Sequence, residues 1–295
     1  MSNKKSIFWF LGIAFAFSWI MFCIPLAFKS NPTVYQQMAV LFWAIGMWGP
    51  GLAAIIVTIF IAKEPFSNLR LNRLGKFRYY LAAWFIPPLL VISTIVLSIL
   101  IGTAQYDPDF TTMKAIADQS SQAGVDIPVT TLILIQLVQA LILGPIINVF
   151  VTMGEELGWR GFLLPKMLPM GEWKALIWGG VIWGVWHAPV ILQGHNYPDH
   201  PVLGVLLMII FCVFLSIIIG WIYLRTRSPW SAAIAHGSLN AWGGLAIVFL
   251  VPGFDTALGG TITSVTGFII LALFVGLLVF SKGLPVRTEE PVAQE

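Results

Sequence analysis

The chain has 295 residues, of which 58% are apolar and only 10% are charged. In soluble domains roughly a quarter of all residues are charged, so this composition excludes an ordinary soluble domain and indicates an integral membrane protein. The net charge of +3 is too small to suggest a nucleic-acid partner, and the two cysteines, Cys23 and Cys212, lie in apolar runs, which argues against a disulfide framework or a cysteine metal site.

Continuous apolar runs recur along the whole chain. A helix needs about 20 apolar residues to cross the hydrocarbon core of a bilayer, and the strands of a membrane barrel would instead alternate apolar and polar residues. We therefore predict an all-α polytopic membrane protein, a bundle of about eight transmembrane helices. The first run is not followed by a cleavage pattern and is expected to be an ordinary helix. The predicted spans are residues 7–26, 38–62, 79–101, 130–152, 173–192, 202–224, 232–251 and 262–280.

The distribution of Lys and Arg predicts the orientation. If the N-terminus faces the cytoplasm, fourteen of the sixteen basic residues fall in inside segments, and only Lys29 and Lys114 fall outside. By the positive-inside rule, both termini are expected in the cytoplasm, with the protein in a bacterial cell membrane. The inside residues are Lys4, Lys5, Lys63, Arg70, Arg73, Lys76, Arg78, Arg160, Lys166, Lys174, Arg225, Arg227, Lys282 and Arg287.

Two polar segments divide the chain. Residues 102–128 are polar and acidic and are expected to form an outside loop with a surface helix, and the tail from Lys282 is expected to be disordered. We predict three parts: three transmembrane helices and the outside loop over residues 1–128, the helices that carry the chemistry over residues 129–251, and a last helix with the tail over residues 252–295.

Ionisable and amide side chains gather at similar depths in three spans. An ionisable side chain near the bilayer centre costs roughly 2.5–3.5 kcal/mol, so such residues persist where they pair, line a wet cavity or take part in chemistry. If the fourth helix continues beyond residue 152, with a kink at its proline, Glu155 and His236 lie about 14 Å from the inner end, and His187 and Asn240 about 20 Å. We therefore expect one site that opens toward the cytoplasm.

Helical phase separates the roles of the two neighbouring glutamates. Glu156 and Arg160 are four residues apart and can pair on one face, whereas Glu155 points about 100° away and has no local cation. His236 and Asn240 are also four residues apart and share a face.

This set of residues supports peptide hydrolysis without a nucleophilic serine or cysteine. A desolvated glutamate beside a histidine can take a proton from water as that water attacks a carbonyl carbon. An imidazole N–H and an amide N–H can stabilise the resulting oxyanion. Each residue alone has a simpler interpretation, such as an ion pair, a packing histidine or an interhelical hydrogen bond; their joint occurrence at one depth favours the catalytic one. His195 and His200 are expected to be solvated, and Trp183 could hold the His187 ring.

Three motifs resemble those of a known family. The stretch "EELGWRGFLLP" is similar to E-E-x-x-x-R-G, "WGVWH" to F-x-x-x-H with Trp183 in place of Phe, and "HGSLN" to H-x-x-x-N. Together, in this order, they resemble the CPBP family of CAAX prenyl protease-like and bacteriocin-processing (Abi) intramembrane endopeptidases. The first three helices carry no signal of this family.

The resemblance implies a glutamate protease on a bundle of eight helices, with no metal or other cofactor. By family role, Glu155 and His187 would activate water, His236 and Asn240 would form the oxyanion hole, and Glu156 with Arg160 would brace the site. It also implies a peptide or membrane-protein substrate, prenylated in some family members, and a role in bacteriocin immunity in others. The substrate and the oligomeric state stay open.

Two alternatives remain open at this point. Zinc could be held by His187, His236 and a glutamate, although the chain has no H-E-x-x-H motif. A proton-coupled transporter or a non-catalytic scaffold could use the same residues as a relay or an ion-pair anchor.

Overall fold

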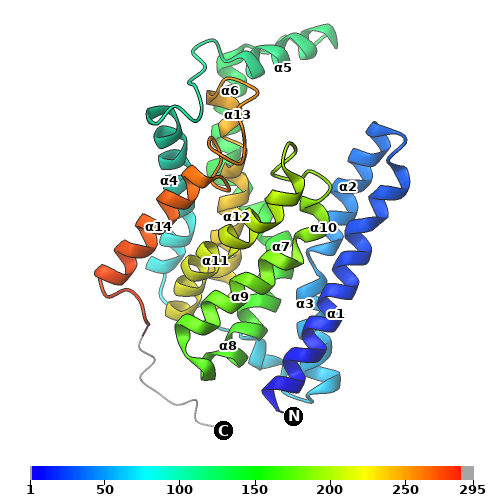
Figure 1. The fold of residues 1–295 in the computed structure, drawn as a ribbon, viewed down its shortest axis with the longest axis vertical. Coiled ribbons are helices and arrows are strands. Elements are labelled where there is room, and N and C mark those ends of the chain that lie inside the picture. The colour runs from blue at the N-terminus through cyan, green and yellow to red at the C-terminus, as the bar shows by residue number, and fades with distance from the viewer. Residues whose placement is uncertain (1, 287–295) are drawn as a thin grey trace.

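The computed structural model describes residues 2–286, and every regular element in this range is helical. Figure 1 shows a bundle in which the N-terminus, α8 and the start of α9 lie at the lower end, while α5, α13 and the start of α2 lie at the upper end. The α-helices are α1 Asn3–Cys23, α2 Pro32–Gly46, α3 Gly49–Ile56, α4 Arg78–Leu100, α5 Thr111–Gln122, α6 Val129–Val138, α7 Gly144–Glu156, α8 Leu164–Met167, α9 Glu172–Trp186, α10 Ala188–Ile191, α11 Pro201–Thr226, α12 Pro229–Gly243, α13 Ala246–Phe249 and α14 Val265–Phe280. Three 3₁₀-helices, η1 Ile24–Phe28, η3 Phe66–Leu69 and η6 Leu168–Met170, and three π-helical segments, η2 Val57–Ile61, η4 Gln139–Leu143 and η5 Leu157–Leu163, complete the described part.

The length and composition of these helices confirm an all-α polytopic membrane protein. Within the described residues, six helical stretches are long and apolar enough to cross a bilayer, and they correspond to six of the eight predicted spans. The other two predicted spans form shorter helices: residues 262–280 give α14, and residues 173–192 give α9 followed by α10. The expected surface helix in residues 102–128 is α5. The six stretches are Asn3–Phe28, Pro32–Ile61, Arg78–Leu100, Val129–Met170, Pro201–Thr226 and Pro229–Phe249.

The fourth stretch runs for 42 residues from Val129 to Met170, beyond the predicted span of residues 130–152, so the condition set for the depth of Glu155 is met. Its helix widens into π-helical turns at two places. The first, η4, lies directly before Pro145, which has no backbone N–H and cannot complete the regular hydrogen-bond ladder. The second, η5, follows Glu156 and contains Arg160. Such π-turns occur frequently at functional sites in helices.

Small residues bring the site-bearing helices close to their neighbours. Gly154, next to Glu155, lies against the start of α3: a Cβ atom on it would lie 2.8 Å from the Cα of Trp48, the residue that precedes α3. On α9, a Cβ atom on Gly180 would lie 2.5 Å from the Cα of Val213 in α11. Close backbone approach at small residues is the usual way in which helices pack inside a membrane. These contacts therefore fix the positions of the two helices that carry Glu155 and His187.

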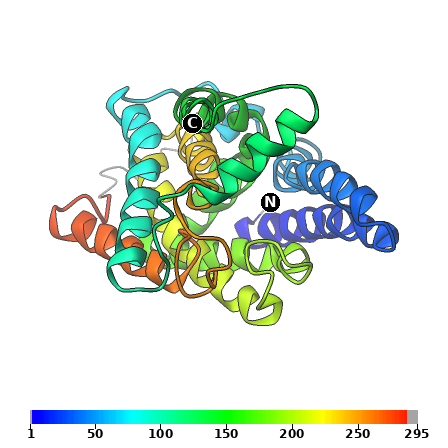
Figure 2. The same cartoon turned by 90° about the horizontal axis from the view of Figure 1, so that it is seen from above.

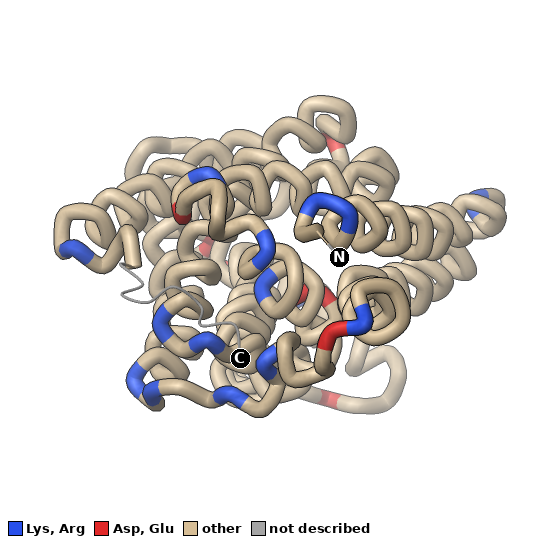
Figure 3. Tube along the Cα trace, turned by 90° about the horizontal axis from the view of Figure 1, so that it is seen from below, with Lys and Arg blue, Asp and Glu red and all other residues tan. Residues whose placement is uncertain are grey.

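The two ends of the bundle differ in charge. We call the end formed by residues 2–5, 62–77, 166–174, 225–228 and 281–286 the basic end, where many of the Lys and Arg residues lie (Figure 3). We call the opposite end, formed by residues 24–31, 101–128, 192–200 and 244–264, the distal end. It holds Lys29 and Lys114 as its only Lys or Arg residues among these described segments, together with six aspartates: Asp107, Asp109, Asp118, Asp126, Asp199 and Asp255. The predicted tail from residue 287 onward, with Arg287, lies outside the described residues.

Candidate active site

Glu155 is buried and bonded to the indole of Trp183. Its side chain is only 1% exposed, although it carries a carboxylate. The Nε1–H group of Trp183 in α9 donates a hydrogen bond of 2.6 Å to its Oε2. Within the described part of the chain, no Lys, Arg or His lies within ion-pair distance of this carboxylate.

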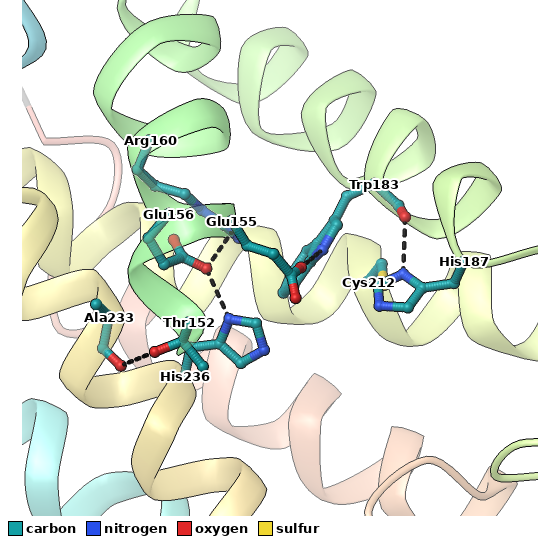
Figure 4. A network of polar contacts seen from close by, with 9 residues as sticks. All are labelled: Thr152, Glu155, Glu156, Arg160, Trp183, His187, Cys212, Ala233 and His236. Carbon is teal, nitrogen blue, oxygen red and sulfur yellow. Dashed lines mark hydrogen bonds and ion pairs between the residues drawn. The ribbon is translucent and has the colours of Figure 1, made fainter. Parts of the chain in front are cut away.

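Glu156 joins three helical segments through one oxygen atom. Its Oε1 accepts a hydrogen bond from Nη1 of Arg160 at 2.9 Å and lies 3.0 Å from Nδ1 of His236 in α12. All three side chains are at most 5% exposed. The guanidinium of Arg160 also lies 4.3 Å from the centre of the Trp183 ring. The predicted pair of Glu156 and Arg160 is confirmed, and the structure adds His236 to it (Figure 4).

The hydrogen bonds of the two histidines define which ring nitrogen remains free. Nδ1 of His187 lies 2.9 Å from the backbone oxygen of Trp183, and Nδ1 of His236 faces the Glu156 carboxylate. Because both partners only accept hydrogen bonds, we assign the hydrogen to Nδ1 in each ring. This leaves Nε2 of each imidazole as the nitrogen available to water or to a ligand.

One cavity joins all four residues predicted to be catalytic. Its volume is about 780 Å³, and Glu155, His187, His236 and Asn240 all line it. Figure 4 shows the Glu155 carboxylate between the two imidazole rings in this view. Asn240 is the exposed member of the set and lies one helical turn beyond His236 on α12. A cavity of this size with a few convergent polar groups in an apolar lining is typical of a ligand site.

The direction in which the cavity extends differs from the prediction. Toward the distal end it is lined by Gly194 and Asn196 on one loop and by Thr256 and Thr263 on another, so it leads away from the basic end. The sequence analysis expects an opening toward the basic end, whereas the lining of this cavity extends toward the distal end. The difference arises because large buried side chains fill the space between the site and the basic end.

Large side chains that follow Glu155 and Glu156 in the sequence fill this space. Trp159 is 3% exposed and Leu163 is 1% exposed. The pocket that these two residues line with Arg160 has a volume of about 10 Å³, room for about one water molecule.

Two further polar residues were not identified from the sequence. Thr152 in α7 donates a hydrogen bond of 2.9 Å to the backbone oxygen of Ala233 in α12, and Asn148 donates one of 3.0 Å to that of Gly237. They tie the helix of Glu155 to the helix of His236. Thr152 and Asn148 lie three and seven residues before Glu155, which places all three on one helical face, and this periodicity is the signal that could have identified them.

Other predicted residues have mixed outcomes. Trp183 holds His187 through its backbone oxygen, as expected for its position one turn earlier, but its indole bonds to Glu155. His195 is exposed, as predicted, and also lines the distal part of the cavity against Trp43. His200 is half-buried and lies 3.1 Å from Asp255.

The zinc alternative needs three ligands around one point. Among residues 2–286, no group of three or more His, Cys, Asp and Glu side chains is arranged to hold a metal ion. The described part of the chain therefore offers no ligand set for it.

Comparison with known proteins agrees with the geometry. Residues 130–242 match the family described as Rce1-like, type II CAAX prenyl endopeptidase Rce1-like. This segment contains all three motifs and all four residues at the cavity. Comparison with curated proteins gave no significant match. The family match confirms the resemblance to the CAAX protease-like family over residues 130–242, and the long apolar helices are those of a multi-pass membrane protein.

Proposed function

We propose that the chain is an intramembrane endopeptidase in which Glu155 and His187 activate a water molecule. The observation that carries the proposal is that Glu155, His187, His236 and Asn240, from three helical stretches, line one cavity inside the bundle. The match of residues 130–242 to a peptidase family supports the reaction class.

The hydrogen bonds support a division of labour between the residues. Glu155 would accept a proton from water, with the free Nε2 of His187 accepting a hydrogen bond from the same molecule. The water oxygen forms a bond to the carbonyl carbon of the substrate, and the carbonyl π electrons move to its oxygen. When the C–N bond breaks, Glu155 returns the proton to the leaving amine, so that one peptide bond and one water give a carboxyl group and an amine.

Asn240 and His236 would stabilise the oxyanion. The side-chain amide of Asn240 supplies two N–H donors, but His236 can donate from Nε2 only as an imidazolium, because its Nδ1–H faces Glu156. Glu156 and Arg160 hold the His236 ring in position, because Oε1 of Glu156 contacts both Nη1 of Arg160 and Nδ1 of His236.

The substrate would be a peptide or a segment of a membrane protein. The cavity is lined mainly by apolar side chains, among them Phe22, Met208 and Phe211, which suit an apolar segment better than a charged one. The charge difference between the two ends supports placing the basic end in the cytoplasm. The membrane itself is proposed to be a bacterial cell membrane.

Substrate trapping tests this proposal in cells. Glu155→Gln keeps the shape of the side chain and removes its basicity, so the variant should insert normally, and membrane proteins or peptides that the wild type cleaves should accumulate uncleaved. Glu64→Gln is the matched control, because Glu64 pairs with Lys166 at 2.8 Å close to the basic end, remote from the cavity. If cells with Glu155→Gln form the same cleavage products as cells with Glu64→Gln, Glu155 is not the base.

A further inference from the structure

Two arginines lie together at the basic end, where the C-terminal end of α11 packs against the segment of residues 62–77. Arg70 lies in this segment, and its Nη1 donates a hydrogen bond of 3.5 Å to the hydroxyl of Tyr223 in α11. Arg227 follows Tyr223 by one turn, and its backbone N–H donates a hydrogen bond of 2.6 Å to the backbone oxygen of that residue. Tyr223 is fully buried, so it holds the two arginines as neighbours.

Neither arginine forms an ion pair with a described acid. Both are half-buried, and among residues 2–286 no Asp or Glu lies within ion-pair distance of either. Partial burial, and after it the positive charge of Arg70, lowers the pKa of the Arg227 guanidinium below its usual range. Glu172 opposes this effect from a greater distance, but its Oε1 accepts a hydrogen bond of 2.7 Å from the backbone N–H of Val286. The two adjacent positive charges can therefore be neutralised by an external anion.

The segment that carries Arg70 is fixed by its contacts with two helices. Nε1 of Trp230 in α12 donates a hydrogen bond of 2.9 Å to the backbone oxygen of Leu71. Gly75 has a φ of +74° and approaches α11 so closely that a Cβ atom on it would lie 2.6 Å from the Cα of Thr226. The arginines are therefore positioned before a ligand arrives, which lowers the entropic cost of binding.

The two arginines lie at the level expected for lipid headgroups. Arg227 directly follows the membrane-spanning stretch Pro201–Thr226. The segment of Arg70 also exposes large apolar side chains, among them Leu74 at 64% and Phe77 at 73%. At a membrane surface, apolar side chains of this kind enter the acyl region while neighbouring cations contact the anionic headgroups. The exposed apolar residues therefore favour a lipid over a free phosphate ion.

The pair of arginines is separate from the cavity. Tyr223 lies two turns, about 12 Å, beyond Leu215, the last residue of α11 that lines the cavity. Figure 2 shows α4 and α14, two neighbours of α11, on one side of the bundle, and α1 with α2, which lines the cavity, on the opposite side. A ligand at the two arginines therefore occupies a site of its own.

We propose that Arg70 and Arg227 bind the phosphate group of an anionic phospholipid. Guanidinium groups donate paired hydrogen bonds to phosphate oxygens, and such contacts are both strong and geometrically specific. The acyl chains lie along the exposed apolar side chains of the same segment. Binding anchors the connection between α3 and α4 to the lipid surface, a property that does not depend on peptide hydrolysis.

Lipid binding by the purified full-length protein tests the site. The protein in a mild detergent is mixed with phosphatidylglycerol or with phosphatidylcholine, and bound lipid is measured by native mass spectrometry. We expect the wild type to prefer phosphatidylglycerol, and Arg70→Gln/Arg227→Gln to bind it about tenfold or more weakly. Arg73→Gln/Lys76→Gln is the matched control, because it removes the same charge from exposed positions of the same segment, and it should bind like the wild type.

The controls distinguish a specific lipid site from general charge and from free phosphate. Equal weakening in the two double variants would overturn the proposal. Equal binding of the two lipids by the wild type would also overturn it, and this comparison decides the matter even if Arg70→Gln/Arg227→Gln does not fold. Phosphatidylglycerol should raise the melting temperature of the wild type, whereas inorganic phosphate at millimolar concentration should leave it unchanged. If inorganic phosphate raises it as much as the lipid does, the assignment to a phospholipid is wrong.

Discussion

Replacing Trp183 by Phe removes its hydrogen bond to Glu155 and makes a buried aromatic ring smaller. The substitution keeps an aromatic ring at the position and deletes the N–H group that donates to Glu155 at 2.6 Å. A hydrogen bond to a charged group contributes about 1.5–3 kcal/mol. Because a stability change of 1 kcal/mol shifts the melting temperature of a chain of this order of size by about 2–4 °C, we expect Trp183→Phe to melt about 3–12 °C lower.

The same substitution should impair cleavage if the proposed function is correct. Without its donor, the Glu155 carboxylate is free to rotate, and a displacement of about 1 Å at a reacting group can cost about 10²-fold in rate. The test distinguishes two expectations, because Phe is the usual residue at this position of the F-x-x-x-H motif. The motif alone predicts that the variant keeps its activity; the hydrogen bond predicts that it does not.

Trp159→Phe provides the matched control. Trp159 is as buried as Trp183, but its Nε1 has no hydrogen-bond partner among the described residues. Both variants are purified in the same detergent and compared by thermal unfolding and by cleavage of a trapped substrate. Equal melting temperatures and equal cleavage rates in the two variants would refute the reasoning about Trp183.

Three further predictions concern the ion pair, the oxyanion donor and the outer loop. Arg160→Met leaves Glu156 buried without its cation and should lower the free energy of unfolding by about 3–5 kcal/mol. Lys166→Met breaks a more exposed ion pair and should lower it by no more than about 1 kcal/mol. Similar melting temperatures of the two variants would contradict this. Asn240→Ala should lower the cleavage rate by about 10²–10³-fold with an unchanged melting temperature, and an unchanged rate would exclude it as a donor. Burial alone would raise the pKa of Asp107, but the backbone N–H groups at the start of α5 hold it below the ordinary 3.8. Its contribution to stability is therefore complete above pH 3.8 and is lost as the pH falls through the lowered pKa, so hydrogen exchange in α5 should accelerate there, but not in Asp107→Asn.

The elements of the site that depend on local geometry could be predicted from the sequence. Glu156 and Arg160 pair because residues four apart on a helix are neighbours wherever the helix lies. The shared depth of Glu155 and His236 follows from a constant rise per residue. Glu155 and His236 can line the same cavity when the helices that carry them pack at an ordinary distance.

The contacts between helices could not be predicted in the same way. Whether Glu155 meets Trp183, and Glu156 meets His236, depends on how the helices are rotated about their axes, and the close packing at Gly154 and the π-helical turns of η5 set this rotation. The extension of the cavity lining toward the distal end could not be predicted for a related reason. Depth along a helix does not reveal which side of a site is filled by large side chains.

The cleavage rate of the purified protein in proteoliposomes tests the central claim most directly. With a substrate identified by trapping, the rates of the wild type, Glu155→Gln and Glu64→Gln are measured side by side. If Glu155 is the base that activates water, Glu155→Gln should be slower by about 10²–10⁴-fold while Glu64→Gln retains the wild-type rate. A rate for Glu155→Gln within a few-fold of the wild type would contradict the account.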